Sequence, residues 1–321
     1  MERILVAGGA GFIGSHLCKK LLSQNFEVIC IDNFLTGNKK NIEALLSNAS
    51  FTLIEHDISE QISNFQFPIS NFQYIFHLAS PASPNRKSSR SYINLPIETL
   101  LVNSVGTYNL LELARKSGAK FLYASSSEIY GDPTVSPQHE DYFGNVSPNG
   151  IRSVYDEGKR FGEALTMAFV RREGIDGRIV RIFNTYGPSM APDDGRVVSN
   201  FITQALAGQA LTVYGDGSQT RSFCYVDDMV EGLIKAMFTD NTKGEVINLG
   251  NPDERSVSDL AALVKKMAES TSDITFEELP EDDPTRRKPD TTKAKTLLSW
   301  EPKIAIEEGL VKTIQYFKEE I

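Results

Sequence analysis

The stretch VAGGAGFIG, residues 6–14, joins a short apolar segment to an amphipathic one near the start of the chain. Glycines at positions 8, 11 and 14 allow a tight turn and let backbone N–H groups approach a pyrophosphate closely. The spacing is GxxGxxG rather than GxGxxG, and by itself such a triplet is a weak signal. Its place between a predicted strand and a predicted helix favours a dinucleotide-binding turn.

A carboxylate ends the second predicted strand. Asp32 would accept hydrogen bonds from ribose hydroxyls and repel a 2′-phosphate, which favours NAD over NADP. The alternative is that Asp32 only forms a turn before Asn33. Asp57 follows the third strand and is expected near the adenine, although a loop aspartate is often merely solvated. The residues predicted to contact the cofactor are Gly8, Gly11, Phe12, Ile13, Gly14, Asp32, Asn33, Asp57, Ile58, Leu78, Ala79, Tyr155 and Lys159.

Short β-branched segments alternate with stretches of helical periodicity in the first part of the chain. This rhythm predicts an α/β fold, a doubly wound parallel sheet of the Rossmann type with helices on both faces. The predicted strands are residues 3–7, 27–32, 51–55, 74–78, 120–125 and 177–181, and the predicted helices are residues 12–22, 97–117 and 155–173.

The rhythm changes after about residue 183, where loops separate helical stretches at 197–207 and 257–268. We expect an NAD-binding domain over residues 1–183, with segments near 223–249 returning to it. Residues 184–321 are expected to form mainly a smaller α/β lobe for the substrate. The charged run 277–290 has mixed signs and is expected to be a solvated loop.

Tyr155 and Lys159 are four residues apart in a predicted helix, so their side chains project from one face. A phenol is a poor base, but a neighbouring ammonium and a positive nicotinamide would favour the phenolate. Tyr155 would then exchange a proton with a sugar hydroxyl or ketone. The YxxxK pattern also fits a plain surface pair. Ser126, at the end of a predicted strand where ligands bind in such sheets, favours the catalytic interpretation.

The composition narrows the classes of partner. A net charge of −9 argues against nucleic acid or an anionic membrane surface. Cys18, Cys30 and Cys224 lack disulfide or metal spacing and are expected to be reduced, and the four histidines predict no metal site. No signal-like segment precedes the first strand and no apolar run approaches membrane-spanning length, so a cytoplasmic protein is expected.

Taken together, these motifs resemble those of extended short-chain dehydrogenases/reductases that act on nucleotide sugars, and most of all the UDP-glucuronate decarboxylases. The similarity extends over nearly the whole chain. Its most discriminating stretches are SSSE at 125–128, YDEGK at 155–159, DGRVVSNFI at 194–202 and RKPD at 287–290.

The resemblance implies a lyase that converts UDP-glucuronate to UDP-xylose through a 4-keto sugar while NAD is regenerated. It assigns acid–base chemistry near C5 to Glu128 and places Arg287 at the sugar carboxylate, which a planar guanidinium can hold by two hydrogen bonds. The alternatives are a buried hydrogen-bond partner for Glu128 and a surface cation for Arg287. The implied catalytic residues are Tyr155, Lys159, Ser126, Ser127, Glu128 and Arg287, and the implied substrate-binding residues are Asn184, Arg196, Val197, Tyr214, Arg221 and Arg287.

Other functions stay open at this point. A nucleotide-sugar 4,6-dehydratase commonly has an Asp-Glu pair where this chain has Ser127 and Glu128, and a UDP-sugar 4-epimerase needs only the oxidation at C4. An NAD-binding sensor would not need intact Tyr155 and Lys159. Residues 85–92 form a longer and more basic loop than is usual in the decarboxylases, which is either a feature of the sugar pocket or a mobile surface insertion. The resemblance also implies a homodimer, formed through residues 97–117 and 155–173.

Overall fold

A computed structural model describes residues 1–61, 71–278 and 286–321. Its largest element is a seven-stranded sheet in the order β11-β6-β5-β4-β1-β2-β3, with every neighbouring pair parallel. This arrangement confirms the predicted fold. The strands are β1 (Arg3–Ala7), β2 (Glu27–Asp32), β3 (Phe51–Glu55), β4 (Tyr74–His77), β5 (Lys120–Ser126), β6 (Gly177–Ile182) and β11 (Val246–Leu249).

Successive residues of each strand enter opposite sides of the core, as the pleat requires. In β1, Ile4 and Val6 belong to one buried cluster, whereas Leu5 and Ala7 belong to another. Both faces of the sheet are therefore covered, which explains why these strands are apolar at nearly every position.

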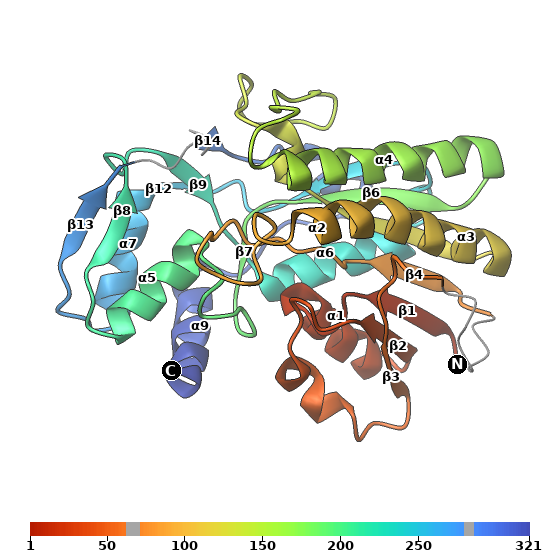
Figure 1. Ribbon diagram of the computed structural model, residues 1–321, viewed down its shortest axis with the longest axis horizontal. Coiled ribbons are helices and arrows are strands. Elements are labelled where there is room, and N and C mark those ends of the chain that lie inside the picture. Colours follow the sequence, from red (N-terminus) through yellow and green to blue (C-terminus); the bar gives the residue numbers. More distant parts are fainter. Residues whose placement is uncertain (62–70, 279–285) are drawn as a thin grey trace.

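Two groups of helices cover these faces (Figure 1). One face carries α2 (Pro96–Leu101), α3 (Thr107–Ser117) and α4 (Ser153–Glu173), and the other carries α1 (Phe12–Ser23) and α6 (Val226–Phe238). The helix predicted over residues 97–117 is interrupted by a π-helical turn, η3 (Val102–Gly106). The turn contains buried Asn103, whose amide donates to the Ser80 hydroxyl at 2.9 Å and whose carbonyl accepts from the Tyr123 hydroxyl at 3.0 Å. Periodicity alone does not predict such a turn.

The later part of the chain forms a second lobe beside the carboxyl ends of the strands, at the left of Figure 1. β11 nevertheless pairs with β6 in the large sheet, so the chain crosses back after the lobe has begun. The elements outside the large sheet include the helices α5 (Val197–Leu206), α7 (Val257–Met267), α8 (Thr292–Leu298) and α9 (Ile306–Glu320), and the strands β7 (Thr185–Tyr186), β8 (Leu211–Tyr214), β9 (Thr220–Ser222), β10 (Cys224–Tyr225), β12 (Glu254–Ser256), β13 (Ile274–Glu277) and β14 (Arg286–Arg287).

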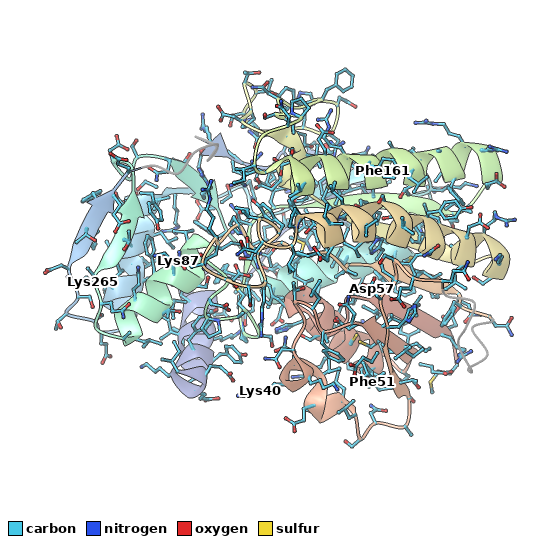
Figure 2. All side chains as sticks on the ribbon, viewed as in Figure 1. Lys40, Phe51, Asp57, Lys87, Phe161 and Lys265 are labelled. Atoms are coloured by element: carbon cyan, nitrogen blue, oxygen red, sulfur yellow. The ribbon has the colours of Figure 1, made fainter. Side chains whose placement is uncertain are left out.

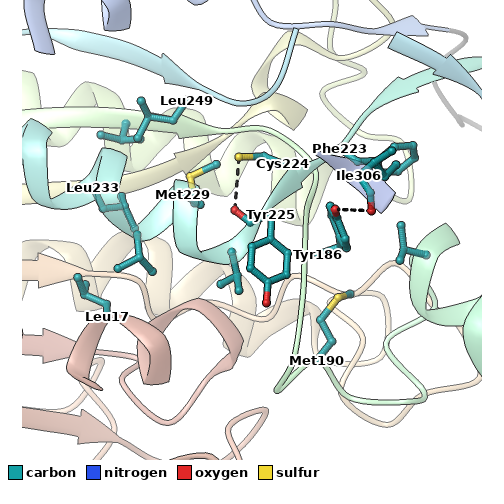
Figure 3. Packing of buried hydrophobic residues seen from close by; sticks show 14 of the residues in the cluster. Leu17, Tyr186, Met190, Phe223, Cys224, Tyr225, Met229, Leu233, Leu249 and Ile306 are labelled. Carbon is teal, nitrogen blue, oxygen red and sulfur yellow. Dashed lines mark hydrogen bonds between the residues drawn. The ribbon is translucent and has the colours of Figure 1, made fainter. Parts of the chain in front are cut away.

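Apolar packing joins the two lobes. Figure 3 shows Tyr186 and Tyr225 between α6 and the segment that begins α9, with the Tyr186 hydroxyl donating to the Ile306 carbonyl at 3.2 Å. These residues and the cluster on the α1–α6 face of the sheet form one continuous core. The lobes are therefore fixed on one another by burial of apolar surface.

Three further expectations concern the charged run 277–290, the cysteines and membrane-spanning segments. Part of the charged run 277–290, residues 279–285, lies outside the described residues. A solvated loop is wrong for Arg287, which lies in β14 with a relative exposure of 1%. Cys18, Cys30 and Cys224 are free and buried. Within the described residues, no helix combines the length and the apolar character needed to cross a membrane.

Two glycines one turn apart in α4 provide a test of core packing. A Cβ on Gly162 would lie 2.2 Å from the Tyr123 hydroxyl, whereas a Cβ on Gly158 would meet nothing nearer than 3.5 Å. We expect Gly162→Ala to lower the free energy of unfolding by about 1–3 kcal/mol because of overpacking. Gly158→Ala is the control and should be neutral or stabilising, since alanine favours helix. Urea denaturation measures both, and equal stabilities of the two variants would contradict the prediction.

Candidate active site

A cavity of about 680 Å³ lies between the lobes, at the carboxyl ends of the large sheet. It is lined by every residue predicted to be catalytic and every residue predicted to bind substrate. Sequence reasoning therefore assembled one site from positions scattered between 126 and 287. The predicted cofactor residues divide into those that line the cavity, namely Gly8, Gly11, Phe12, Ile13, Gly14, Leu78, Tyr155 and Lys159, and those that do not, namely Asp32, Asn33, Asp57, Ile58 and Ala79.

The glycine turn has the geometry of a phosphate cradle. Gly11 caps α1, whose first turn contains no acidic residue, and the turn opens into the cavity. Gly8 has φ of +80°, and a Cβ on Gly14 would lie 2.1 Å from the Gly8 carbonyl oxygen. Side chains are thus excluded where a pyrophosphate would meet the free N–H groups and positive end of α1. These residues fit a dinucleotide.

The predicted residues outside the cavity lining form its surroundings at the ends of β2 and β3. The Asp32 carboxylate accepts hydrogen bonds from the backbone N–H groups of Ala10 and Phe34, each at 2.9 Å. Burial raises the pKa of Asp32, although these two hydrogen bonds oppose the shift. The Asn33 amide donates to Asp57 at 2.9 Å, which ties the two strand ends together. Contact of these residues with a cofactor stays a prediction.

Of the two remaining positions, Ile58 is buried and Ala79 is half-buried. The Ile58 side chain packs in the core on the α3–α4 face of the sheet, and its carbonyl accepts from Asn109 at 2.9 Å. The backbone of Ala79 lies against Gly8, so closely that a Cβ on Gly8 would be 2.6 Å from the Ala79 nitrogen. Ala79 thus packs against the glycine turn, whereas Ile58 belongs to the core beside α3.

Tyr155 and Lys159 enter the cavity from the first turns of α4. The Lys159 ammonium donates to the Ala124 carbonyl at 2.9 Å and lies 5.8 Å from the centroid of the Tyr155 ring. Burial raises the pKa of Tyr155 to about 12, with a hydrogen bond to Ser126 opposing it, and burial lowers the pKa of Lys159 to about 7. The sequence predicts that the Lys159 ammonium and the nicotinamide together favour the phenolate of Tyr155. In the protein without the nicotinamide, burial opposes ionisation of both side chains, and the combined effect stays a prediction.

Glu128 is held by two arginines. Arg287 Nη2 lies 3.4 Å from Glu128 Oε2, and Arg152 Nη2 pairs with the same oxygen. Burial would raise the pKa of Glu128, but the charges of Arg287 and Arg152 lower it overall. Arg287 also donates to the Ser127 carbonyl at 2.8 Å, which fixes β14 against the end of β5. The surface-cation alternative for Arg287 is thus wrong, and Glu128 is an ionised acceptor in this cluster.

Three residues of this region were missed by sequence reasoning. Arg152 is the second partner of Glu128, and the Tyr92 ring stacks on that of Tyr155 with centroids 5.0 Å apart. Asp156, inside the YDEGK stretch, is buried, and its pKa is raised by burial and by the negative charge of Glu128. Two nearby carboxyl groups with opposite shifts are typical of acid–base sites. Asp156 lies within the YDEGK stretch and Tyr92 within the basic loop 85–92, but the sequence gave no indication that either side chain packs at the site.

The second lobe contributes the remaining wall. The Arg196 guanidinium is bidentate on Asp194, at 2.5 and 2.8 Å, and lies 5.9 Å from the centroid of the Phe12 ring. Val197 begins α5, while Tyr214 ends β8 with 37% relative exposure. The wall thus combines a fixed cation with an accessible aromatic ring, which suits a nucleotide.

Comparisons with known proteins agree with this geometry. The profile of the NAD dependent epimerase/dehydratase family matches residues 4–250. The chain is 51% identical over 320 residues to UDP-glucuronic acid decarboxylase 1 of Danio rerio, covering 100% of this chain and 73% of the relative. It is 52% identical over 309 residues to UDP-glucuronic acid decarboxylase 6 of Arabidopsis thaliana, covering 96% and 86%. UDP-glucuronic acid 4-epimerase from Bacillus cereus, solved with UDP-glucuronic acid and NAD, superposes with a TM-score of 0.87 at 30% identity, covering 99% and 100%.

Replacing the buried lysine tests the electrostatics of this site. The pKa of Lys159 falls from 10.5 to about 7 on folding, so the unfolded chain binds more protons between these values and stability rises with pH across this window. We expect Lys159→Met, in protein freed of nicotinamide cofactor, to be more stable than the parent at pH 7 by on the order of 2 kcal/mol. The difference should shrink toward pH 10.5. Thermal unfolding at several pH values measures it, with exposed Lys116→Met as control. A difference independent of pH would refute the shift.

Proposed function

The chain belongs to the NAD-dependent epimerase/dehydratase family, and from this premise we propose that it decarboxylates UDP-glucuronate to UDP-xylose through a 4-keto sugar. One observation carries the assignment. The Nε and Nη2 atoms of Arg287 are buried and donate no hydrogen bond to any described residue, although Nη2 faces Glu128. These two atoms form one edge of the guanidinium, which matches the two oxygens of a carboxylate.

The glycine turn and α1 would hold the cofactor pyrophosphate, and Asp32 would accept hydrogen bonds from its ribose. When bound, NAD⁺ supplies the reversible acceptance of a hydride from C4 of the sugar. The Lys159 ammonium lies near the Tyr155 ring and lines the same cavity, so it would contact both the cofactor and the phenol.

Tyr155 would take the proton of the C4 hydroxyl as the sugar is oxidised, with Ser126 hydrogen-bonded to the same oxygen. The C6 carboxylate is then β to a ketone. Carbon dioxide leaves as the C5–C6 bond breaks, and its electron pair passes into the enolate whose oxygen Tyr155 and Ser126 stabilise. Proton transfer to C5 and reduction at C4 complete the cycle, so there is no net oxidation.

Glu128 would act in the protonation of C5 as an ionised group that orients water. This role follows from the two arginines, which keep the pKa of Glu128 low and so make it a poor direct acid. Asp156 has the opposite shift, caused by burial and by the charge of Glu128, and it lies outside the cavity lining.

We also propose that two copies associate through the helices on the α3–α4 face of the sheet. This surface carries exposed apolar side chains from all of its helical segments, among them Ile97 at 62% and Phe161 at 50% relative exposure. Phe161 lies on α4 in Figure 2, and α2 and α4 pack side by side. The apolar residues of the surface are Ile97, Leu100, Leu101, Val105, Tyr108 and Phe161. So large an exposed apolar patch is typical of an interface.

Product analysis tests the reaction. Incubation with UDP-glucuronate and NAD⁺ should release equimolar carbon dioxide and a UDP-pentose, identified by mass and NMR. Tyr155→Phe should lower turnover by at least about 10²-fold, since the proton shuttle is lost, while the variant still binds NAD⁺. UDP-galacturonate as the product would instead indicate an epimerase, and full turnover by the variant would remove Tyr155 from proton transfer.

Substitution in the apolar surface tests the association. Leu101→Asp combined with Phe161→Asp should convert a dimer to a monomer in light scattering, because the charges would be buried without partners. Phe143→Asp changes an aromatic side chain that is 87% exposed outside the surface and should leave the mass unchanged. A parent protein that is monomeric at every concentration, or a double variant that stays dimeric, would contradict the proposal.

A further inference from the structure

The basic loop at residues 85–92 lies at the cavity, and it was not assigned a function by the family resemblance. We propose that Arg86, Lys87 and Arg90 of this loop bind the diphosphate of the nucleotide-sugar substrate, as an additional anion site in the cleft. The identity of the sugar rests on the proposed function, whereas the binding of a diphosphate by these cations does not. All three residues line the cavity.

The loop is held in a defined shape by its own hydrogen bonds. At its base, the Ser91 hydroxyl donates to the Ser83 carbonyl at 2.9 Å. Near its tip, the Asn94 amide donates to the carbonyls of Arg86 and Ser88, at 2.9 and 2.8 Å. The alternative of a mobile insertion does not describe this arrangement, because the backbone that carries the cations is tied at both ends of the loop.

The loop is also attached to the opposite lobe. The Ser88 hydroxyl donates to the Asp193 carboxylate at 2.7 Å, and the Asn85 amide donates to the Asp193 carbonyl at 2.9 Å. The contact is close, since a Cβ on Gly195 would lie 2.2 Å from the Asn85 Cβ. Figure 2 places Lys87 between the two lobes. Asn85 and Ser88 thus anchor the loop at the cleft, while the side chains of Arg86 and Lys87 are exposed and that of Arg90 is half-buried.

The pairing of charged side chains in the cleft favours an anionic ligand. Arg196 and Arg287 already face the carboxylates of Asp194 and Glu128. In contrast, over residues 1–61, 71–278 and 286–321 no ion pair involves any of the three loop cations. A chain with a net charge of −9 has many carboxylates available for pairing. Three cations kept without such partners at one rim would attract and hold a phosphate group.

The position of the loop favours the substrate diphosphate over that of the cofactor. The cofactor pyrophosphate is expected at the glycine turn, in front of α1. The loop instead contacts residues 193–195, which lead directly to Arg196 and α5 on the expected nucleotide side. At its other end, Tyr92 stacks on Tyr155. The loop thus runs from the sugar to the nucleotide, and the diphosphate joins these two parts of the substrate.

Calorimetry on NAD-loaded enzyme tests the proposal with UDP and UMP as probes. The variant R86A/K87A/R90A should bind UDP roughly tenfold more weakly, as expected for partly exposed charge pairs, with a smaller loss for UMP. Its KM for UDP-glucuronate should rise with little change in kcat, and UDP binding should depend less steeply on salt. K87A alone should shift UDP affinity in the same direction by a smaller factor.

The control variant K19A/K265A/K266A removes the same number of positive charges at positions outside the cavity lining, and it should bind UDP like the parent. Equal UDP affinity of the loop variant and this control would overturn the proposal. So would a loop variant that loses NAD⁺ affinity while UDP binding is unchanged, because the cations would then serve the dinucleotide. UDP binding needs no turnover, so weaker UDP binding by the loop variant supports the site even if the parent forms no UDP-pentose.

Discussion

The site depends on one topological constraint, the point between β1 and β4 where the order of strands in the sheet reverses. The chain winds from β1 outward through β2 and β3, then continues on the other side of β1 through β4, β5 and β6. Loops at the carboxyl ends of β1 and β4 must therefore diverge, which leaves a crevice where ligands bind in such sheets. The glycine turn follows β1, the basic loop follows β4, and Ser126 is the last residue of β5. All of the chemistry discussed here is placed around this crevice.

Burial of charge is the main cost of this arrangement. Glu128 shares its cluster with two arginines, so its desolvation is offset by opposite charge, and removal of either arginine would leave a buried imbalance. The same cluster leaves one edge of Arg287 without a hydrogen-bond partner among the described residues. A buried donor pair in this state costs stability until a ligand supplies acceptors. In the proposed reaction, the carboxylate of the sugar would supply these acceptors.

The sequence was sufficient for the sheet, because β-branched runs and glycine turns have strong local patterns. Its motifs also contain the residues that the fold brings to one cavity, although their catalytic and substrate-binding roles stay predictions. The sequence did not predict the features that depend on contacts between residues far apart in the chain. The π turn at Asn103 depends on partners from two other segments, and the burial of Arg287 depends on β14 pairing with β9. Arg152, Tyr92 and Asp156 were missed for the same reason. Their role arises from what the fold places against Glu128 and Tyr155, and not from their own neighbours in the sequence.

The pKa values of Tyr155 and Lys159 show how burial sets the protonation states of these two side chains. Both groups are almost fully enclosed, and desolvation moves the pKa of the phenol up to about 12 and that of the ammonium down to about 7. Between these values the neutral forms dominate, which is the least costly state for two groups in one apolar region. Proton transfer from a substrate therefore requires a change in the local field. Any positive charge that enters beside the phenol would lower its pKa, and closure of the cleft by ligands would strengthen that effect by excluding water. The proposed base is thus weak in the protein alone and becomes effective only when positive charge has been brought beside it.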